Sequence, residues 1–88
     1  MGFSQSIHTF KQKLDKEYNW PAEYVFKFIV PEEGASSIVA LFPNHEPRIK
    51  KSSKGNYTSL SFAVRVESSD EVIDLYILAN EVDGVIAL

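Results

Sequence analysis

The residues with the clearest capacity for chemistry stand in two turn segments, residues 31–37 and 51–56. They combine small residues that expose backbone N–H groups with lysines, and they are Gly34, Ser36, Ser37, Lys51, Lys54 and Gly55. Free N–H groups at the start of a helix bind anions, and nearby cations strengthen that binding. The two segments therefore predict a site for a small carboxylate or phosphate, provided that the fold brings them together. The alternative is that both glycines only make turns and that Glu32 and Glu33 pair with the lysines.

No other residues form a recognisable catalytic or metal site. The chain has no cysteine, which excludes disulfides, thiolate zinc sites and thiol nucleophiles. Of the two histidines, His8 stands alone, and His45 with Glu46 falls short of the three or four ligands that a metal site needs. A nucleophile, a base and an orienting group cannot be placed within reach of one another. We therefore expect a protein that is not an enzyme and that uses no cofactor.

The charge of the chain argues against nucleic acid, and its short apolar runs argue against a membrane. Its 88 residues carry a net charge of -3, whereas nucleic-acid binding requires positive charge against phosphates. No apolar run approaches the roughly 20 residues that span a bilayer, and the start lacks a secretory signal, so we expect a cytoplasmic protein.

Four cations cluster in the middle of the chain, namely Arg48, Lys50, Lys51 and Lys54, and no lysine or arginine follows Arg65. This distribution predicts a basic edge strand beside an acidic helix.

The elements that would position these residues begin with a helix. A serine cap at Ser4 or Ser6 opens it. Its apolar residues at helical spacing are Ile7, Phe10 and Leu14. That stripe is narrow, which predicts loose packing on the rest of the molecule. Because Pro21 cannot continue a helix, we expect a helical extension over residues 1–20 and one domain over residues 21–88.

Two long strands are expected over residues 23–30 and 57–67. The second alternates apolar and polar side chains, which buries one face, and the first directs its larger apolar residues to the core and has a second face that is half apolar. The residues expected in the core are Tyr24, Phe26, Phe28, Val30, Leu60, Phe62, Val64 and Val66. In chain order, the other expected elements are a helix over residues 35–42, a strand over residues 48–52, a hairpin turn at Gly55, a helix capped by Ser68 or Ser69 and a strand over residues 85–88.

This order of elements, β-α-β-β-α-β after the first helix, contains two βαβ units. Because such crossovers are right-handed, they predict a four-stranded antiparallel sheet in the order 4-1-3-2 with two helices on one face. This is the ferredoxin-like α+β sandwich, and it places segments 31–37 and 52–56 at the same end of the sheet. The second face carries Val25, Lys27 and Ile29, and we expect the first helix or a second subunit to cover it.

The open face of such a sheet has few aromatic residues. RNA recognition motifs share the fold and stack bases on aromatic residues of that face. Here Tyr57 is the one aromatic residue expected there, beside polar residues such as Ser59 and Arg65. For an acidic chain, this pattern disfavours RNA binding.

Three segments, residues 26–31, 52–57 and 85–88, resemble the YbeD-like family of small bacterial proteins. The similarity runs from about Trp20 to Leu88 and is most specific over residues 52–57. Members of this family resemble ACT domains, which are small ferredoxin-like modules that bind amino acids and regulate enzymes. The resemblance implies this fold, a cytoplasmic location and a regulatory role, and it carries no catalytic residues.

These observations predict a non-enzymatic regulatory or protein-interaction module with an unknown protein partner. They are also compatible with a homodimer. The alternative is a sensor of the ACT type that binds a small carboxylate or phosphate metabolite at Gly34, Lys51 and Lys54. A sensor gains thermal stability from its ligand, whereas an interaction module co-purifies with a protein.

Overall fold

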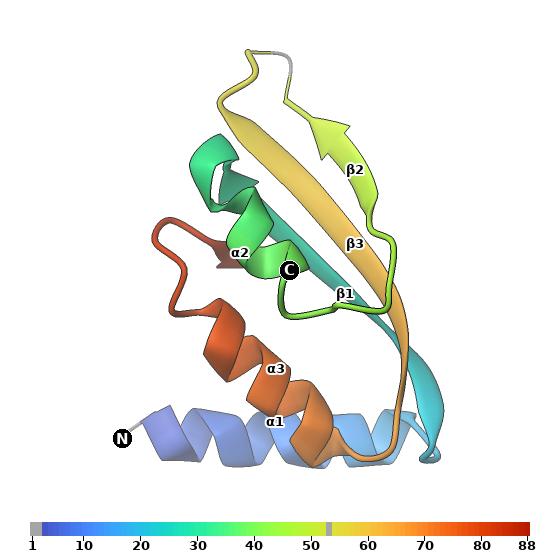
Figure 1. Cartoon of the computed structure of the whole chain (residues 1–88). Coiled ribbons are helices and arrows are strands. Elements are labelled where there is room, and N and C mark those ends of the chain that lie inside the picture. Colours follow the sequence, from blue (N-terminus) through green and yellow to red (C-terminus); the bar gives the residue numbers. More distant parts are fainter. Residues whose placement is uncertain (1–2, 53) are drawn as a thin grey trace.

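Four strands pair into one antiparallel sheet in the computed structural model, which describes residues 3–52 and 54–88 and the side chains from Ile7 onward (Figure 1). In chain order the elements are α1 (Phe3–Glu17), β1 (Ala22–Pro31), the 3-10 helix η1 (Glu32–Gly34), α2 (Ala35–Val39), β2 (Arg48–Lys51), β3 (Tyr57–Val66), α3 (Ser69–Ala79) and β4 (Ile86–Ala87). The sheet order is β2-β3-β1-β4. This is the predicted order read from the opposite edge, so the ferredoxin-like arrangement is confirmed.

The two central strands, β1 and β3, fix the faces of the sheet. They are antiparallel and pair over their whole length, starting with Ala22 opposite Val66. Directly opposite residues share a face, so Phe26 lies beside its partner Phe62 on the face that α2 and α3 cover. The period of two in both strands therefore sorts their side chains as the sequence predicts.

Phenylalanines form the middle of the core between this face and the helices. Phe26, Phe28 and Phe62 are completely buried. Phe42, which follows α2, stacks on Phe62 with ring centroids 4.1 Å apart. The other buried apolar residues are Leu14, Val30, Ile38, Leu60, Val64, Val66, Val72, Ile73 and Ala79. Of the predicted core residues, Tyr24 alone is half-buried rather than buried.

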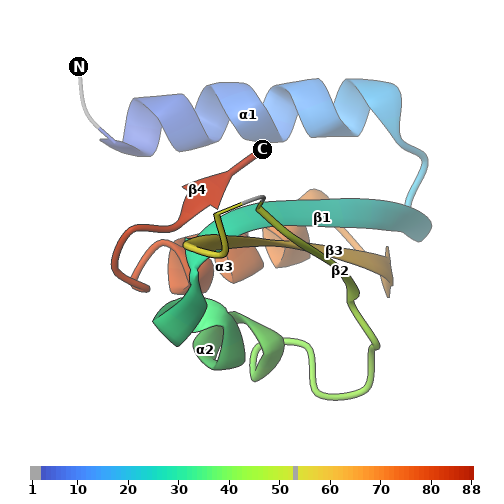
Figure 2. The same cartoon turned by 90° about the horizontal axis from the view of Figure 1, so that it is seen from above.

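Helix α1 packs against the rest of the domain more closely than the loose packing that its narrow apolar stripe predicts. Leu14 is only 4% exposed and belongs to the core, and the Phe10 ring packs on Tyr76 of α3 with centroids 5.8 Å apart. Lys11 Nζ donates to Ser69 Oγ at 2.9 Å and to Asp70 Oδ1 at 3.0 Å, at the start of α3. Figure 2 shows α1 along the β1 and β4 side of the molecule, with α2 on the other side of the strands. The helix therefore packs against α3 and leaves the open face of the sheet uncovered.

Several elements are shorter than predicted. Helix α2 ends at Val39, after which Leu41 and Phe42 donate to carbonyls three residues back, so the chain tightens into turns. β4 contains two residues instead of the four predicted. The predicted caps Ser4 and Ser6 fall inside α1, and their side chains lie outside the described part of the structure. Among the described helices, none is long and apolar enough to cross a membrane.

Two glycines with the same backbone conformation differ in their surroundings, which gives a first prediction. Gly55 has φ 75° and Gly84 has φ 77°. A Cβ on Gly55 would meet nothing within 4 Å, whereas one on Gly84 would lie 2.8 Å from Pro31 Cγ. We expect Gly55→Ala to cost about 1–2 kcal/mol of unfolding free energy from the left-handed backbone alone. For Gly84→Ala we expect an additional ~1–3 kcal/mol from overpacking. Urea unfolding of both variants checks this, and equal losses would contradict it.

Candidate functional site

The predicted anion site belongs to the end of the sheet that carries the β2–β3 hairpin. The backbone N–H of Glu32 donates to the carbonyl oxygen of Asn56 at 3.3 Å, so η1 lies against the hairpin as the topology predicts. Lys51 Nζ donates to Glu32 Oε2 at 2.6 Å. The Thr58 hydroxyl donates to Glu32 Oε1 at 3.2 Å. The carboxylate of Glu32 therefore occupies the place beside Lys51 that an external anion would take.

The start of α2 carries Gly34, Ser36 and Ser37. Gly34 and Ser37 line a cleft of about 550 Å³. Three carboxylates line it too, those of Glu33, Glu81 and Asp83. A Cβ on Gly34 would lie 2.8 Å from Val30 Cγ2, so close packing requires glycine here. The carboxylates disfavour an anion in this cleft.

The remaining predicted ligand-binding residues, Lys54 and Gly55, form the tip of the hairpin and are exposed. Neither Lys51 nor Lys54 lines the cleft of Gly34 and Ser37. Lys54 makes no ion pair within residues 3–52 and 54–88. The structure thus brings the two segments to one end of the sheet but turns their candidate groups toward different neighbours, and the anion site stays a prediction.

The ion pair between Lys51 and Glu32 gives a second prediction, which concerns the pKa of the Glu32 carboxyl. The hydrogen bond and charge of Lys51, and then the Thr58 hydroxyl, hold the pKa of the Glu32 carboxyl below its ordinary value of 4.5. A lowered folded-state pKa contributes stability above the unfolded pKa, and this contribution is lost as the pH falls through the folded pKa. We expect Lys51→Met to raise the pKa of Glu32 in a carboxyl NMR titration, while Lys54→Met leaves it unchanged. An equal response to both variants would show that no specific ion pair exists.

The face of the sheet opposite α2 and α3, the open sheet face, carries a band of cations. Because paired residues share a face, the register places Arg48, Ser61 and Lys27 in one row across β2, β3 and β1. Lys50 belongs to the next row along β2, and Arg65 lies four residues from Ser61 along β3. All four cations are exposed. We call Lys27, Arg48, Lys50 and Arg65 the basic band.

Apolar side chains of β1 and β4 lie beside the basic band. Val25 is 56% exposed and Ile86 is 52% exposed. Ile29 is half-buried between the strands, where it pairs with Ile86 on one side and with Ser59 on the other. We call Val25, Ile29 and Ile86 the apolar patch. A patch of this kind rimmed by charge is typical of an interaction surface.

The charge of the open sheet face is opposite to that of the whole chain. None of the cations in the basic band forms an ion pair within the described residues, and Glu23, opposite Arg65, is the one carboxylate among the paired positions of this face. The exposed side of α3 and the loop after it instead carry carboxylates, namely Asp70, Glu71, Asp74, Glu81 and Asp83. On a chain with net charge -3, the open sheet face is therefore a local positive region.

Sequence reasoning found the members of this surface singly but did not assemble them. The alternation of β1 and β3 places Lys27 and Arg65 on the open face, whereas Arg48 and Lys50 stand out only as part of a basic edge. The missing information was the register of β2, which pairs Arg48 with Ser61. The tight turn at Gly55 was the signal that could have fixed that register.

The other chemistry-bearing residues do not gather. His8 is exposed and His45 is half-buried, and in the described part of the chain no three histidine, cysteine, aspartate or glutamate side chains could hold a metal. Trp20 stacks on Tyr18 with centroids 5.2 Å apart, and its indole N–H donates to Asp15 Oδ1 at 2.9 Å. That bond, and after it one from the Ser69 hydroxyl, lowers the pKa of Asp15. These contacts fix the end of α1, which is a structural role.

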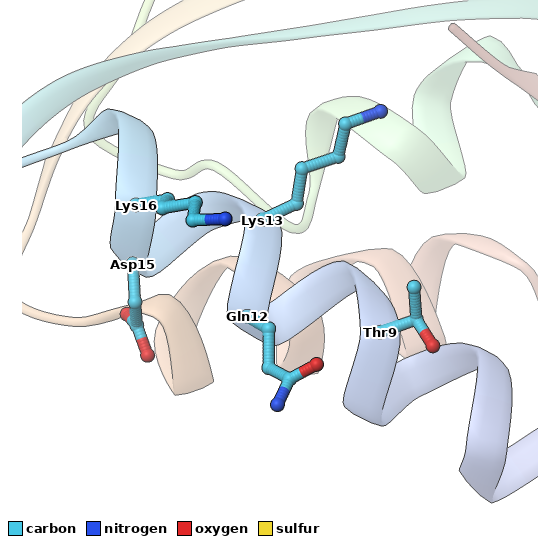
Figure 3. Close-up of a pocket in the computed structure, with 5 residues that line it drawn as sticks. All are labelled: Thr9, Gln12, Lys13, Asp15 and Lys16. Atoms are coloured by element: carbon cyan, nitrogen blue, oxygen red, sulfur yellow. The ribbon is translucent and has the colours of Figure 1, made fainter.

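A hollow of about 680 Å³ lies along α1, but its geometry does not form a site. Its lining residues are Thr9, Gln12, Lys13, Asp15 and Lys16, all from one helix. Figure 3 shows these side chains spreading apart, with Lys13 and Asp15 pointing to different sides of the helix. In the part of the chain that the structure describes, no second element lines the hollow, so a ligand there would stay largely in water.

Comparisons with known proteins agree on one family. Residues 15–88 match the model of a family described as "Protein of unknown function (DUF493)". A UPF0250 protein of Idiomarina loihiensis is 32% identical over 82 residues, which cover 85% of this chain and 93% of the relative. A UPF0250 protein of Shewanella oneidensis is 31% identical over 80 residues, which cover 83% of this chain and 91% of the relative. No solved structure matches the chain. These matches support the resemblance of the sequence to the YbeD-like family, and the chain belongs to the family of proteins of unknown function DUF493.

Proposed function

We propose that this protein is a non-enzymatic interaction module that binds a protein partner through its open sheet face. The observation that carries the proposal is the apolar patch beside the unpaired basic band. Exposed Val25 and Ile86 offer apolar area, and the cations offer a charge pattern that selects and orients a partner. A regulatory role follows if the bound partner is an enzyme.

A paired-variant capture experiment tests the proposal. The tagged protein and the variant Lys27→Glu/Lys50→Glu are used to capture proteins from cells of the source organism, with quantitative mass spectrometry as the readout. The matched control is Lys13→Glu/Lys16→Glu, which makes the same change of charge on exposed residues of α1. We expect at least one protein to be retained about tenfold less by the open-face variant than by the control.

Two outcomes contradict this function. Identical sets of retained proteins for both variants would show that the open sheet face recognises no protein. A rise in the melting temperature with inorganic phosphate or an amino acid, abolished by Lys51→Glu/Lys54→Glu, would instead support the metabolite sensor. Circular dichroism of each variant establishes that it is folded.

A further inference from the structure

The two sides of the open sheet face differ in chemistry. The apolar patch lies on β1 and β4, where Lys27 of the basic band stands between Val25 and Ile29, whereas Arg48, Lys50 and Arg65 of the band lie on β2 and β3. Adjacent strands are ~4.8 Å apart, so the four strands span about 14 Å from β4 to β2. An α-helix with its side chains is ~10–12 Å wide. One helix laid on the face therefore contacts the apolar patch with one side and the basic band with its flank.

We propose that the occupant of this face is an amphipathic α-helix of the partner protein, with an apolar stripe and an acidic flank. This inference rests on the proposed function and names the chemistry of the partner. The apolar stripe covers Val25, Ile29 and Ile86, and glutamate or aspartate side chains on the flank pair with Arg48 and Lys50. The helix then completes a layer on the second face, as α2 and α3 do on the first.

Charge decides against a second copy of the chain packed face to face. A twofold dimer through this surface would bring each basic band against the other basic band or against the partner's apolar patch, depending on the direction of the axis, and in neither case against a row of carboxylates. Like charges in contact disfavour association, and among the paired positions of this face Glu23 is the one carboxylate that offers compensation. An acidic partner instead gains attraction from cations that have no carboxylate partner within the described residues.

The edges of the sheet favour a helix on the face over a strand added to an edge. β2 forms one edge, and all four of its residues, three of them cationic, are exposed. Lysines on an edge strand discourage pairing with another strand. At the other edge, β1 is paired by β4 at Phe28 and Ile29, and α1 runs along that side of the molecule (Figure 2).

Nucleic acid fits this face less well than a helix does. Single strands are held by successive aromatic platforms as well as by cations. Tyr57, 46% exposed, is the one aromatic residue on the paired positions of the open face. The apolar side chains of Val25 and Ile86 would gain nothing from a phosphate backbone.

The test is an NMR titration of the isotope-labelled full chain with designed peptides of about 18 residues, long enough to form helix. The first peptide has leucines at helical spacing and glutamates on the flank. The second has the same composition with the leucines scattered around the helix. The third replaces every glutamate with lysine. At about 0.15 M salt, only charges within roughly 8 Å of each other still interact strongly. Under this condition we expect the first peptide to bind about tenfold more tightly than the others.

The amide signals that move should include those of Val25, Lys27 and Ser61. Lys27→Glu/Lys50→Glu should weaken binding about tenfold, and Lys13→Glu/Lys16→Glu should not. Equal binding of all three peptides, or shifts confined to α1, would overturn the helix proposal. The helix proposal would also be wrong if a proline-containing acidic peptide or a single-stranded oligouridylate bound more tightly than the first peptide. Self-association of the unmodified chain that Lys27→Glu/Lys50→Glu abolishes would contradict it as well. If the peptides fail while the capture experiment still separates the two variants, the interaction function stands and the helix proposal alone is wrong.

Discussion

Replacing Phe62 with alanine is expected to lower the free energy of unfolding by about 3–5 kcal/mol. Phe62 is completely buried, lies opposite Phe26 in the sheet and stacks on Phe42 at 4.1 Å. Removing its ring exposes two other rings to an empty space that the rigid sheet cannot close. A small domain has only about 5–15 kcal/mol of stability, so this single change removes a large part of it.

Urea unfolding of Phe62→Ala, followed by circular dichroism, measures the loss. Ser61→Ala is the matched control, because Ser61 is the next residue of β3 and faces the open side. We expect the control to change stability by less than ~0.5 kcal/mol. If the alanine variant does not fold, Phe62→Leu gives a smaller and measurable loss. A loss below ~1 kcal/mol for Phe62→Ala would show that the core does not depend on this ring.

The burial of Phe62 is predictable from the sequence for a simple physical reason. In a strand, side-chain direction alternates with every residue, so the polar residues Ser59 and Ser61 already assign Leu60 and Phe62 to the buried face. The crossover rule then orders the strands, because the two long apolar strands must lie at the centre. The buried face and the strand order therefore follow from local pattern and chirality alone, and the structure confirms both.

The candidate site was less predictable because it depends on relations between distant segments. The Lys51–Glu32 ion pair joins residues 19 positions apart, and the choice between that pair and an external anion was open in the sequence. The row of Arg48, Ser61 and Lys27 requires the register of two strand pairs at once. A shift of one residue in β2 would turn Arg48 to the other face, so composition alone cannot assemble the basic band.

The position of α1 was also beyond local pattern, since a narrow apolar stripe does not say which surface it meets. The structure places Leu14 in the core and joins Lys11 to Ser69 and Asp70. Neither contact has a counterpart in the sequence, because the partner residues of Lys11 follow it by 58 and 59 positions. With α1 held against α3, the second face of the sheet is left uncovered by the described residues.

Leu14→Ala is therefore expected to destabilise the whole domain, by about 2–5 kcal/mol. Leu14 is 4% exposed, and truncating it leaves a cavity between α1 and the body of the domain. The control is Lys13→Ala, which removes an exposed side chain from the same helix and should cost less than ~0.5 kcal/mol.

Trp20 contacts Tyr18 and Asp15, so its fluorescence reports on the end of α1, whereas circular dichroism reports on the whole backbone. We expect both signals of the Leu14 variant to change together in a single unfolding transition. If Trp20 instead changes at lower urea than the backbone signal, residues 1–20 form an extension that detaches on its own. Helix α1 could then leave α3 while the sheet stays folded. Its packing on α3 would no longer guarantee that the open sheet face stays uncovered. A single shifted transition makes α1 part of one cooperative unit and the open sheet face a fixed surface of it.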